Sequence, residues 1–450
     1  MNKAIIFIDA KSDDNKECPL SFLKVGGLSL LSRQLKQLAA VGISHVYLLS
    51  FSMPEKLHQA LPQFKNIVDK LEVVDANFTD TSFWDGIEKA MLIEEGRLID
   101  QRILNTVLTH EHNNSIAHFD EDDALFGAAS GLMLEINGKS KLFASCALVS
   151  GDCLKIASLA TNYKTHPVAE ILNTMVREGE SIGVNVSNID PYLADQLRDV
   201  PILWRPVSKQ DECTRSTKLL IEHAQNGVLD WPSRFIHPIF ENILTFYTLP
   251  TFVSPTILTL FTVLFGFYVS YLFSIGQMGA ALAGAMIIGV IYGVRQKLSV
   301  VKLQLSKLSP GEHILDNIVE YAWYLSMALY FSNVSESTGL WAVGLIVILF
   351  SWATFVQARF YRCLTSQHLD DTGVFERALR LIGANRNTRV WALAIFALSQ
   401  NLVVGFWALA IYTAITFFAY QWRFIVRAND YLSKVSEAVA GNISKTKFLD

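Results

Sequence analysis

Two acidic residues stand at the entrance of an apolar segment, where they could do chemistry. Asp316 and Glu320 are four positions apart at the start of the apolar segment Ile318–Phe331, so they share one face of a helix. Carboxylates entering a membrane span are costly and mark a functional site by default. With Glu312 and His313 just before them, they form a candidate site for Mg²⁺ or Mn²⁺, because these cations prefer oxygen ligands.

The same residues also allow a structural interpretation. Each carboxylate could pair with a lysine at the start of its helix, with Lys297, Lys302 or Lys307 as candidates. The neighbouring cations have two interpretations as well. Arg295, Lys297 and Lys302 could bind the phosphate groups of a substrate, or they could contact anionic lipid headgroups.

The second half of the chain contains six apolar segments. A helix needs about twenty residues to cross the hydrocarbon core, and Lys and Arg concentrate in cytoplasmic loops. These residues are clustered between segments two and three, between four and five, and after six, which predicts a multi-pass protein of the inner membrane with both termini cytoplasmic. The predicted spans are Val253–Ser274, Met278–Val294, Ile318–Phe331, Leu340–Val356 and two within Val390–Trp422, separated near Ser399, Gln400 and Asn401.

The first half alternates strand-like and helix-like segments. Apolar runs such as Ala4–Asp9, His45–Phe51 and Lys141–Ser150 predict strands, and Leu28–Ala40 has helical periodicity. Alternation of this kind predicts an α/β domain with a mostly parallel sheet. The net charge of -4 excludes a generally basic nucleic-acid-binding protein.

The shift in composition divides the chain of 450 residues into four parts. We expect a cytoplasmic α/β domain over residues 1–230 and an amphipathic juxtamembrane helix over 231–250. An all-α bundle of six spans follows over 251–428, and a tail over 429–450.

The N-terminal part resembles the sugar-nucleotide nucleotidyltransferases. The segment from Cys18 to Leu31 is similar to that family's proline-lysine segment and the helix after it. The family's glycine-rich phosphate loop is replaced by Ala10–Glu17, which has no glycine and carries three acidic residues. Leu20 stands where the family has its lysine, and Arg97 where it has a metal-binding aspartate. The resemblance therefore implies the family's fold without nucleotidyl transfer.

The C-terminal part resembles the six-span CDP-alcohol phosphotransferases. Residues 254–259 are similar to the family's entry into span one, with Thr256 in place of asparagine, and Thr256 becomes a candidate substrate-binding residue. The stretch from Ser309 to Asp316, with Glu320, is similar to the second half of the family's acidic signature. Val294 and Lys297 stand where the first two aspartates are expected. The order of the two domains resembles that of the fused inositol-phosphate cytidylyltransferase and di-myo-inositol-phosphate phosphate synthase enzymes.

The resemblance implies two alternative functions. An active protein would transfer a phosphoalcohol from a CDP-linked donor to an alcohol, in phospholipid or phosphodiester polar-lipid synthesis. Asp316 and Glu320 would then be the catalytic residues with Mg²⁺ or Mn²⁺. The alternative is a catalytically inactive pseudoenzyme that binds lipid or an active paralogue. Membrane lipids, and a second copy of the chain as a homodimer, are the expected partners.

Overall fold

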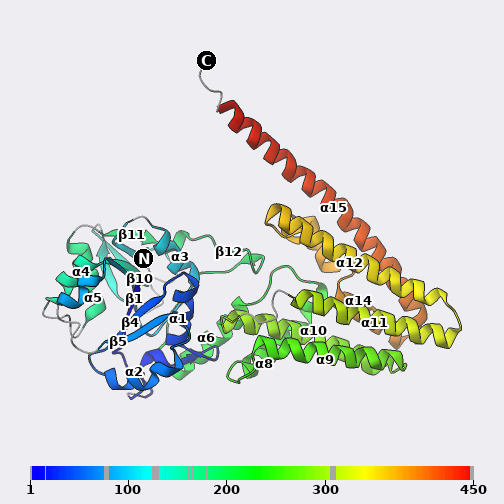
Figure 1. Ribbon diagram of the computed structural model, residues 1–450, viewed down its shortest axis with the longest axis horizontal. Helices are drawn as coiled ribbons and strands as arrows, with labels where there is room; N and C mark the ends of the chain where they lie inside the picture. Colours follow the sequence, from blue (N-terminus) through cyan, green and yellow to red (C-terminus); the bar gives the residue numbers. More distant parts are fainter. Residues whose placement is uncertain are drawn as a thin grey trace.

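The structure is a computed structural model of the whole chain, with an α/β domain followed by a helical domain (Figure 1). It describes residues 3–15, 17–74, 81–110, 112–123, 131–136, 138–160, 163, 166–178, 181–304 and 311–445, except the side chains of residues 312 and 437–445. Lys307, one of the predicted lysine partners, lies outside these residues.

A mixed sheet of eight strands forms the centre of the N-terminal domain. Its order is β11-β8-β10-β6-β1-β4-β5, and β9 pairs with β10. β1, β4, β5 and β6 are parallel, but β10 runs antiparallel to β6, β8 and β9, so the predicted parallel sheet is interrupted at β10. The strands are β1 (Lys3–Phe7), β4 (His45–Leu49), β5 (Lys70–Val74), β6 (Lys89–Ile93), β8 (Ser115–Phe119), β9 (Met133–Ile136), β10 (Lys139–Ser150) and β11 (Ile182–Asn185).

Helices cover both faces of this sheet. A hydrophobic cluster lies on each face of the sheet. Successive side chains of a strand point to opposite faces, so Ile6 of β1 belongs to the first cluster and Ile5 to the second. The first cluster includes α1 and α3, and the second includes α4 and α5. The helices of the domain are α1 (Leu30–Ala40), α2 (Pro54–Ala60), α3 (Gln101–Thr109), α4 (Gly151–Ser158), α5 (Pro167–Arg177) and α6 (Gln210–His223).

Six long helices form the bundle of the C-terminal domain. Four of them are long and apolar enough to cross a membrane, namely α9, α10, α12 and the segment Leu402–Ser436 of α15, which indicates a multi-pass membrane protein. α11 carries Asp316 and Glu320 near its start and α14 has 13 residues, so the count of six spans remains a prediction. The bounds are α9 (Pro255–Ser274), α10 (Met278–Val301), α11 (Glu312–Ser335), α12 (Gly339–Thr365), α14 (Arg386–Leu398) and α15 (Leu402–Lys445).

Short elements complete the helical domain. The predicted amphipathic segment forms α7 (Trp231–Phe235) and α8 (His237–Thr248), and α8 packs along α10. A 3₁₀ turn, η6 (Leu369–Asp371), and α13 (Val374–Ile382) lie between α12 and α14. The predicted break at 399–401 is confirmed, since α14 ends at Leu398 and α15 begins at Leu402. We call the end of the bundle where α10 ends, α11 begins, α12 ends and α14 begins the charged end.

The N-terminal domain contacts the charged end directly through α1. The guanidinium of Arg33 donates to the carbonyl of Val301 at 2.7 Å, and Lys36 donates to the carbonyl of Lys302 at 2.9 Å. These side chains satisfy backbone carbonyls at the end of α10 that have no partner within the helix. Gly27, in the turn between β2 (Lys24–Val25) and β3 (Leu28–Ser29), allows a close approach, because a Cβ there would lie 2.1 Å from the carbonyl oxygen of Leu249.

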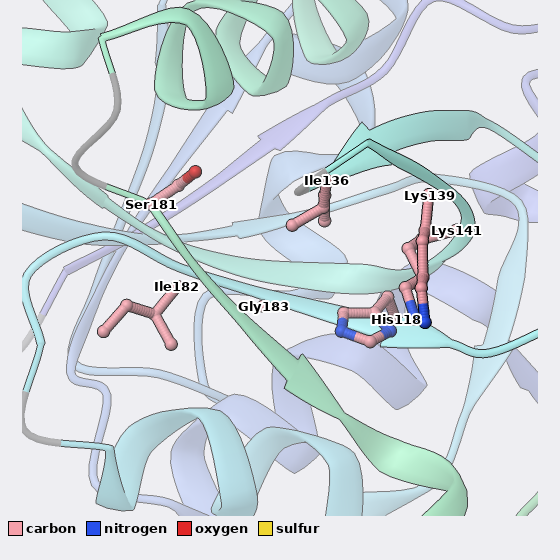
Figure 2. A pocket seen from close by; sticks show the side chains of 7 residues that line it. All are labelled: His118, Ile136, Lys139, Lys141, Ser181, Ile182 and Gly183. Carbon is pink, nitrogen blue, oxygen red and sulfur yellow. The ribbon is translucent and has the colours of Figure 1, made fainter.

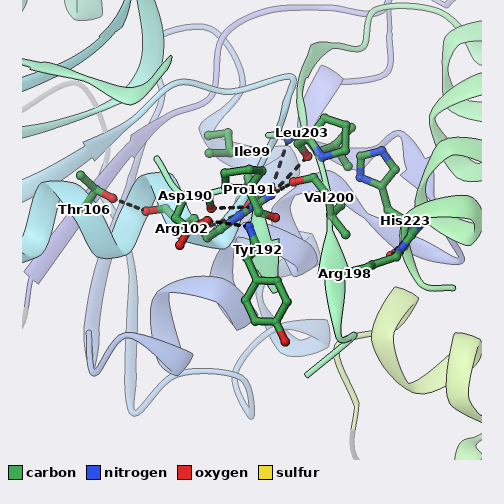
Figure 3. A network of polar contacts seen from close by, with 12 residues as sticks. Ile99, Arg102, Thr106, Asp190, Pro191, Tyr192, Arg198, Val200, Leu203 and His223 are labelled. Atoms are coloured by element: carbon green, nitrogen blue, oxygen red, sulfur yellow. Dashed lines mark hydrogen bonds and ion pairs between the residues drawn. The ribbon is translucent and has the colours of Figure 1, made fainter. Parts of the chain in front are cut away.

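A hairpin of the N-terminal domain, held at both ends by Arg102 (Figure 3), also contacts the charged end. It consists of β12 (Tyr192–Leu193) and β13 (Arg198–Asp199). Arg102 donates to the carbonyls of residues 190, 191, 200 and 201, which fixes both ends of the hairpin. The Tyr192 hydroxyl then donates to Asp371 of η6. The remaining two-stranded sheet joins β7 (Arg97–Ile99) to β14 (Trp204–Pro206).

Candidate functional site

A cavity of about 960 Å³ lies at the charged end of the bundle. Most of its wall comes from α8, α10, α11, α12 and α14, with single residues of α7, α9 and α13, the η6 turn, Leu197 of the hairpin and the segment 224–230 that connects α6 to α7. The cavity is therefore bounded by both domains. It includes four of the predicted site residues, namely Arg295, Lys297, His313 and Asp316.

Asp316 is buried in the cavity wall and is paired with Arg295. The guanidinium of Arg295 donates to the two carboxylate oxygens at 2.8 Å and 3.4 Å. The same guanidinium lies 4.6 Å from the ring centre of Tyr292. A bidentate pair of this kind is geometrically specific, so the Asp316 carboxylate is held toward α10 and away from lipid.

Glu320 lies one turn further along α11 and has a different partner. Its Oε1 accepts from Arg389 of α14 at 2.6 Å and from the Tyr324 hydroxyl at 2.7 Å. Glu320 is buried and does not line the cavity. The shared helix face thus directs both carboxylates into the bundle, but two arginines on two helices bind them separately.

Lys297 is paired with Glu241 of α8, a residue that the sequence did not single out. The ammonium lies 2.8 Å from Glu241 Oε2 and donates to Asn242 at 2.6 Å. Burial raises the pKa of Glu241, although Lys297 acts in the opposite direction. Gly293 makes room for this carboxylate, because a Cβ there would lie 2.0 Å from Glu241 Oε1.

The remaining predicted residues lie outside this network. Lys302 donates to the carbonyls of Thr251 and Val253 at 2.9 Å each, and burial lowers its pKa. It therefore secures the loop before α9 and is not part of the cavity wall. Thr256 is in the first turn of α9, half-buried and likewise outside the wall. The side chain of Glu312 lies outside the described residues.

The donor set does not fit a divalent cation. Within the ranges that the structure describes, no three His, Cys, Asp or Glu side chains converge to hold a metal ion. Asp316, Glu320 and Glu241 each have a cationic partner within 2.8 Å. A Mg²⁺ or Mn²⁺ ion would have to displace these cations and bind beside them, which costs Coulomb energy at short range.

Several arginines in the cavity form no close ion pair within the described residues. Arg359 and Arg362 of α12 line the cavity and are exposed, without an ion pair in the part of the chain described. Arg386 stacks over Tyr292 at 3.7 Å, and its buried Nε has no hydrogen-bond partner among the described residues. Four carboxylates line the cavity, those of Asp230, Glu241, Asp316 and Asp370, against six cationic side chains, so the unbalanced charge in this cavity is positive.

The N-terminal domain has a buried carboxylate, that of Glu95, beside the backbone amides that follow β1. Glu95 Oε1 accepts from the backbone amides of Asp9 and Ala10 at 2.7 Å and 2.5 Å, and Oε2 accepts from Ser21. These amides follow β1, at the carboxyl end of the sheet. Burial raises the pKa of Glu95 to about 8, against the opposing effect of these hydrogen bonds. The two amides are thus already taken by a side chain of the protein.

A second, smaller cavity of about 360 Å³ lies at the β8–β11 edge of the sheet (Figure 2). Its polar lining includes His118, Lys139 and Lys141. Asp120 lies 3.3 Å from His118 Nδ1 and also pairs with Lys141, so this cavity has less unbalanced charge than the large one.

Glu241, Arg359, Arg362 and Arg386 are functional candidates that sequence reasoning missed. In the sequence, the three arginines are part of the loop charges that predict the membrane orientation. A sequence signal for Glu241 was present, since Glu241 follows His237 by four residues on an otherwise apolar amphipathic helix. Gly289 and Gly293, four apart on α10, were a second signal, because small residues at this spacing allow another helix to approach closely.

Comparisons with known proteins do not assign the chain to a family. No family model and no curated protein matches it. Among solved structures, it is similar to a putative glucose-1-phosphate thymidylyltransferase from Bacillus anthracis, with 12% identity, a TM-score of 0.36, and coverage of 48% of this chain and 94% of that one. An inositol-1-phosphate CTP transferase from T. maritima has 13% identity, a TM-score of 0.36, and coverage of 49% and 96%. A phosphatidylinositol phosphate synthase from Mycobacterium tuberculosis, with CDP-DAG bound, has 14% identity, a TM-score of 0.34, and coverage of 42% and 94%.

Proposed function

We propose that this membrane protein binds a phosphate-bearing amphiphile, a CDP-linked or anionic lipid, in the large cavity without metal-dependent transfer. The observation that carries the proposal is the positive charge left over in the cavity. Arg359, Arg362 and Arg386 form no close ion pair within the described residues, whereas Asp316 and Glu241 are already paired with Arg295 and Lys297. The cavity lining holds six cationic side chains against four carboxylates. Guanidinium groups match phosphate geometry and do not lose their charge on burial.

The position of the cavity supports a lipid as the ligand. It lies where two candidate spans, α10 and α12, reach the charged end of the bundle. An amphiphile could place its phosphate among the arginines while its acyl chains remain beside the apolar helices. The clusters of Lys and Arg at this end favour a cytoplasmic location, with both termini on that side of a six-span inner-membrane protein.

Phosphoalcohol transfer is the second candidate function. It is favoured by one observation, the position of Asp316 and His313 in the wall of the same cavity. An active site of this kind would need Asp316 released from Arg295 before it could bind a divalent ion or accept a proton. We propose for the N-terminal domain that nucleotidyl transfer has been lost, because Glu95 binds the amides that follow β1.

Binding of dioleoyl CDP-diacylglycerol and of phosphatidic acid to the full chain in phosphatidylcholine nanodiscs tests the proposal. We expect Arg386→Gln to weaken binding about tenfold, the effect of losing one charge-assisted hydrogen bond. Asp316→Asn should strengthen binding, because it removes one negative charge from the cavity wall. Arg177→Gln, in the exposed last turn of α5, is the matched control and should change nothing.

Two results would contradict the proposal. Binding that is unaffected by Arg386→Gln would show that the cavity is not the phosphate site. Release of CMP from CDP-diacylglycerol that requires Mg²⁺ or Mn²⁺ and is abolished by Asp316→Asn would instead support the transferase.

A further inference from the structure

Helix α13 is oriented with its polar side toward the protein and its apolar side outward. Glu376 is fully buried, whereas Val374 is 87% and Ile382 63% exposed. Val374, Ala378 and Ile382 follow one another at intervals of four, so they form one face of the helix, and all three are exposed. A helix on a water-exposed surface has the opposite arrangement.

Buried ion pairs hold α13 in this orientation. Glu376 Oε1 accepts from Arg423 at 2.9 Å and 2.5 Å and from Arg427 at 2.7 Å, and both arginines belong to α15. Leu379 packs against the cluster of Tyr361, Leu369 and Tyr420. The helix therefore cannot turn its apolar face inward without breaking these contacts.

The apolar face of α13 continues the outer surface of a candidate span. The Phe375 ring lies 5.8 Å from that of Trp422, which is 56% exposed on α15. The guanidinium of Arg423 lies 5.1 Å from the Phe375 ring and 5.2 Å from the Trp422 ring. Aromatic rings and arginine stems are typical of the boundary between headgroups and acyl chains.

We infer that α13 is an interfacial membrane anchor, with Val374, Phe375, Ala378 and Ile382 immersed at the headgroup–acyl boundary and Arg377 at the level of the headgroups. The occupant of this face is the lipid surface, because the face is continuous with the exterior of α15. Immersion of an apolar helix face in this boundary is favourable. Arg377 forms an ion pair with Asp371 of η6 at 2.6 Å, so the apolar face and not this charge carries the attraction. The anchor also joins η6 to α14, so it fixes both segments relative to the membrane.

Spin labels on the full chain in nanodiscs test this inference. Cysteines replace Val374, Ile382 and Arg377 one at a time on a Cys363→Ser background, and Glu178→Cys, on the exposed end of α5, serves as the water reference. Labels at 374 and 382 should collide with oxygen more than with nickel-EDDA. Of the three labels, the one at 377 should be the most accessible to nickel-EDDA.

Each other outcome overturns the inference. Nickel-EDDA access at 374 and 382 equal to that at Glu178→Cys would place the face in water. Protection from both reagents would indicate that another protein copy covers it. The unsubstituted protein provides an independent readout, since a photoactivatable diazirine lipid should label residues 374–382, and absence of that label would also contradict the anchor.

Discussion

Glu376→Gln should destabilise the protein strongly, although the change removes no atom from the core. Glu376 is fully buried and accepts four hydrogen bonds from Arg423 and Arg427. The glutamine side chain keeps the shape and one acceptor. It leaves two guanidinium groups beside a neutral side chain, and the exposed fractions of these arginine side chains are only 15% and 27%.

The pKa of Glu376 gives the size of the expected loss of stability. Burial raises this pKa, but the hydrogen bonds from Arg427 and Arg423 outweigh burial and lower it to about 2. At about 1.4 kcal/mol per pKa unit, the difference from an ordinary value near 4.5 corresponds to about 3 kcal/mol of stability. Removal of one member of a buried ion pair costs about 3–5 kcal/mol in general, which agrees.

Unfolding by SDS in mixed micelles, followed by tryptophan fluorescence, measures this free energy. Asp430→Asn is the matched control, because Asp430 pairs with the same Arg427 at 3.7 Å but is 54% exposed. An exposed pair of this kind contributes about 0–1 kcal/mol. A loss for Glu376→Gln no larger than that for Asp430→Asn would refute the reasoning.

The ion pairs of Glu376 with Arg423 and Arg427 also predict how the stability of the protein depends on pH. The folded pKa of Glu376 is depressed, so its contribution is fully present above pH 4.5 and disappears as the pH falls through about 2. The difference in free energy of unfolding between the unsubstituted protein and Glu376→Gln should therefore become small in strong acid. An undiminished difference between the two proteins at pH 2 would contradict this assignment.

Three further predictions concern other parts of the chain. Glu95 has a folded pKa raised to about 8, so stability should fall as pH rises from about 4.5 to 8, and Glu95→Gln should flatten this dependence in chemical unfolding of the full chain. The full chain should release no pyrophosphate from CTP and a polyol phosphate, and release above the blank would contradict the loss of nucleotidyl transfer. Cysteines at Gln277 and Asn333 should react with an impermeant maleimide from outside the cell and a cysteine at Lys434 only after permeabilisation; the reverse pattern would invert the topology.

Much of the architecture could be predicted because it depends on local patterns. Continuous apolar runs placed β1, β4 and β10, and helical periodicity placed α1, within a few residues of their ends. The break near Gln400 was also readable, since polar residues interrupt a long apolar run. The strand β6 was missed, although its apolar run Ala90–Ile93 is of the same kind as those of β1 and β4.

The charges at the entrance of α11 show how far local information reaches. Their spacing places Asp316 and Glu320 on one helix face. That face is expected to point into the bundle, because a carboxylate that faces lipid is costly. The partners of these carboxylates come from 21 and 69 positions away, on α10 and α14.

Pairing at such separations depends on how helices pack, and no local pattern encodes it. The same holds for Glu241 and Lys297, whose approach needs Gly293 on the facing helix. The orientation of α13 is likewise not encoded locally. Its sequence pattern indicates an amphipathic helix but does not show which side faces the protein. That choice depends on Arg423 and Arg427, which reach Glu376 only because α15 runs beside it.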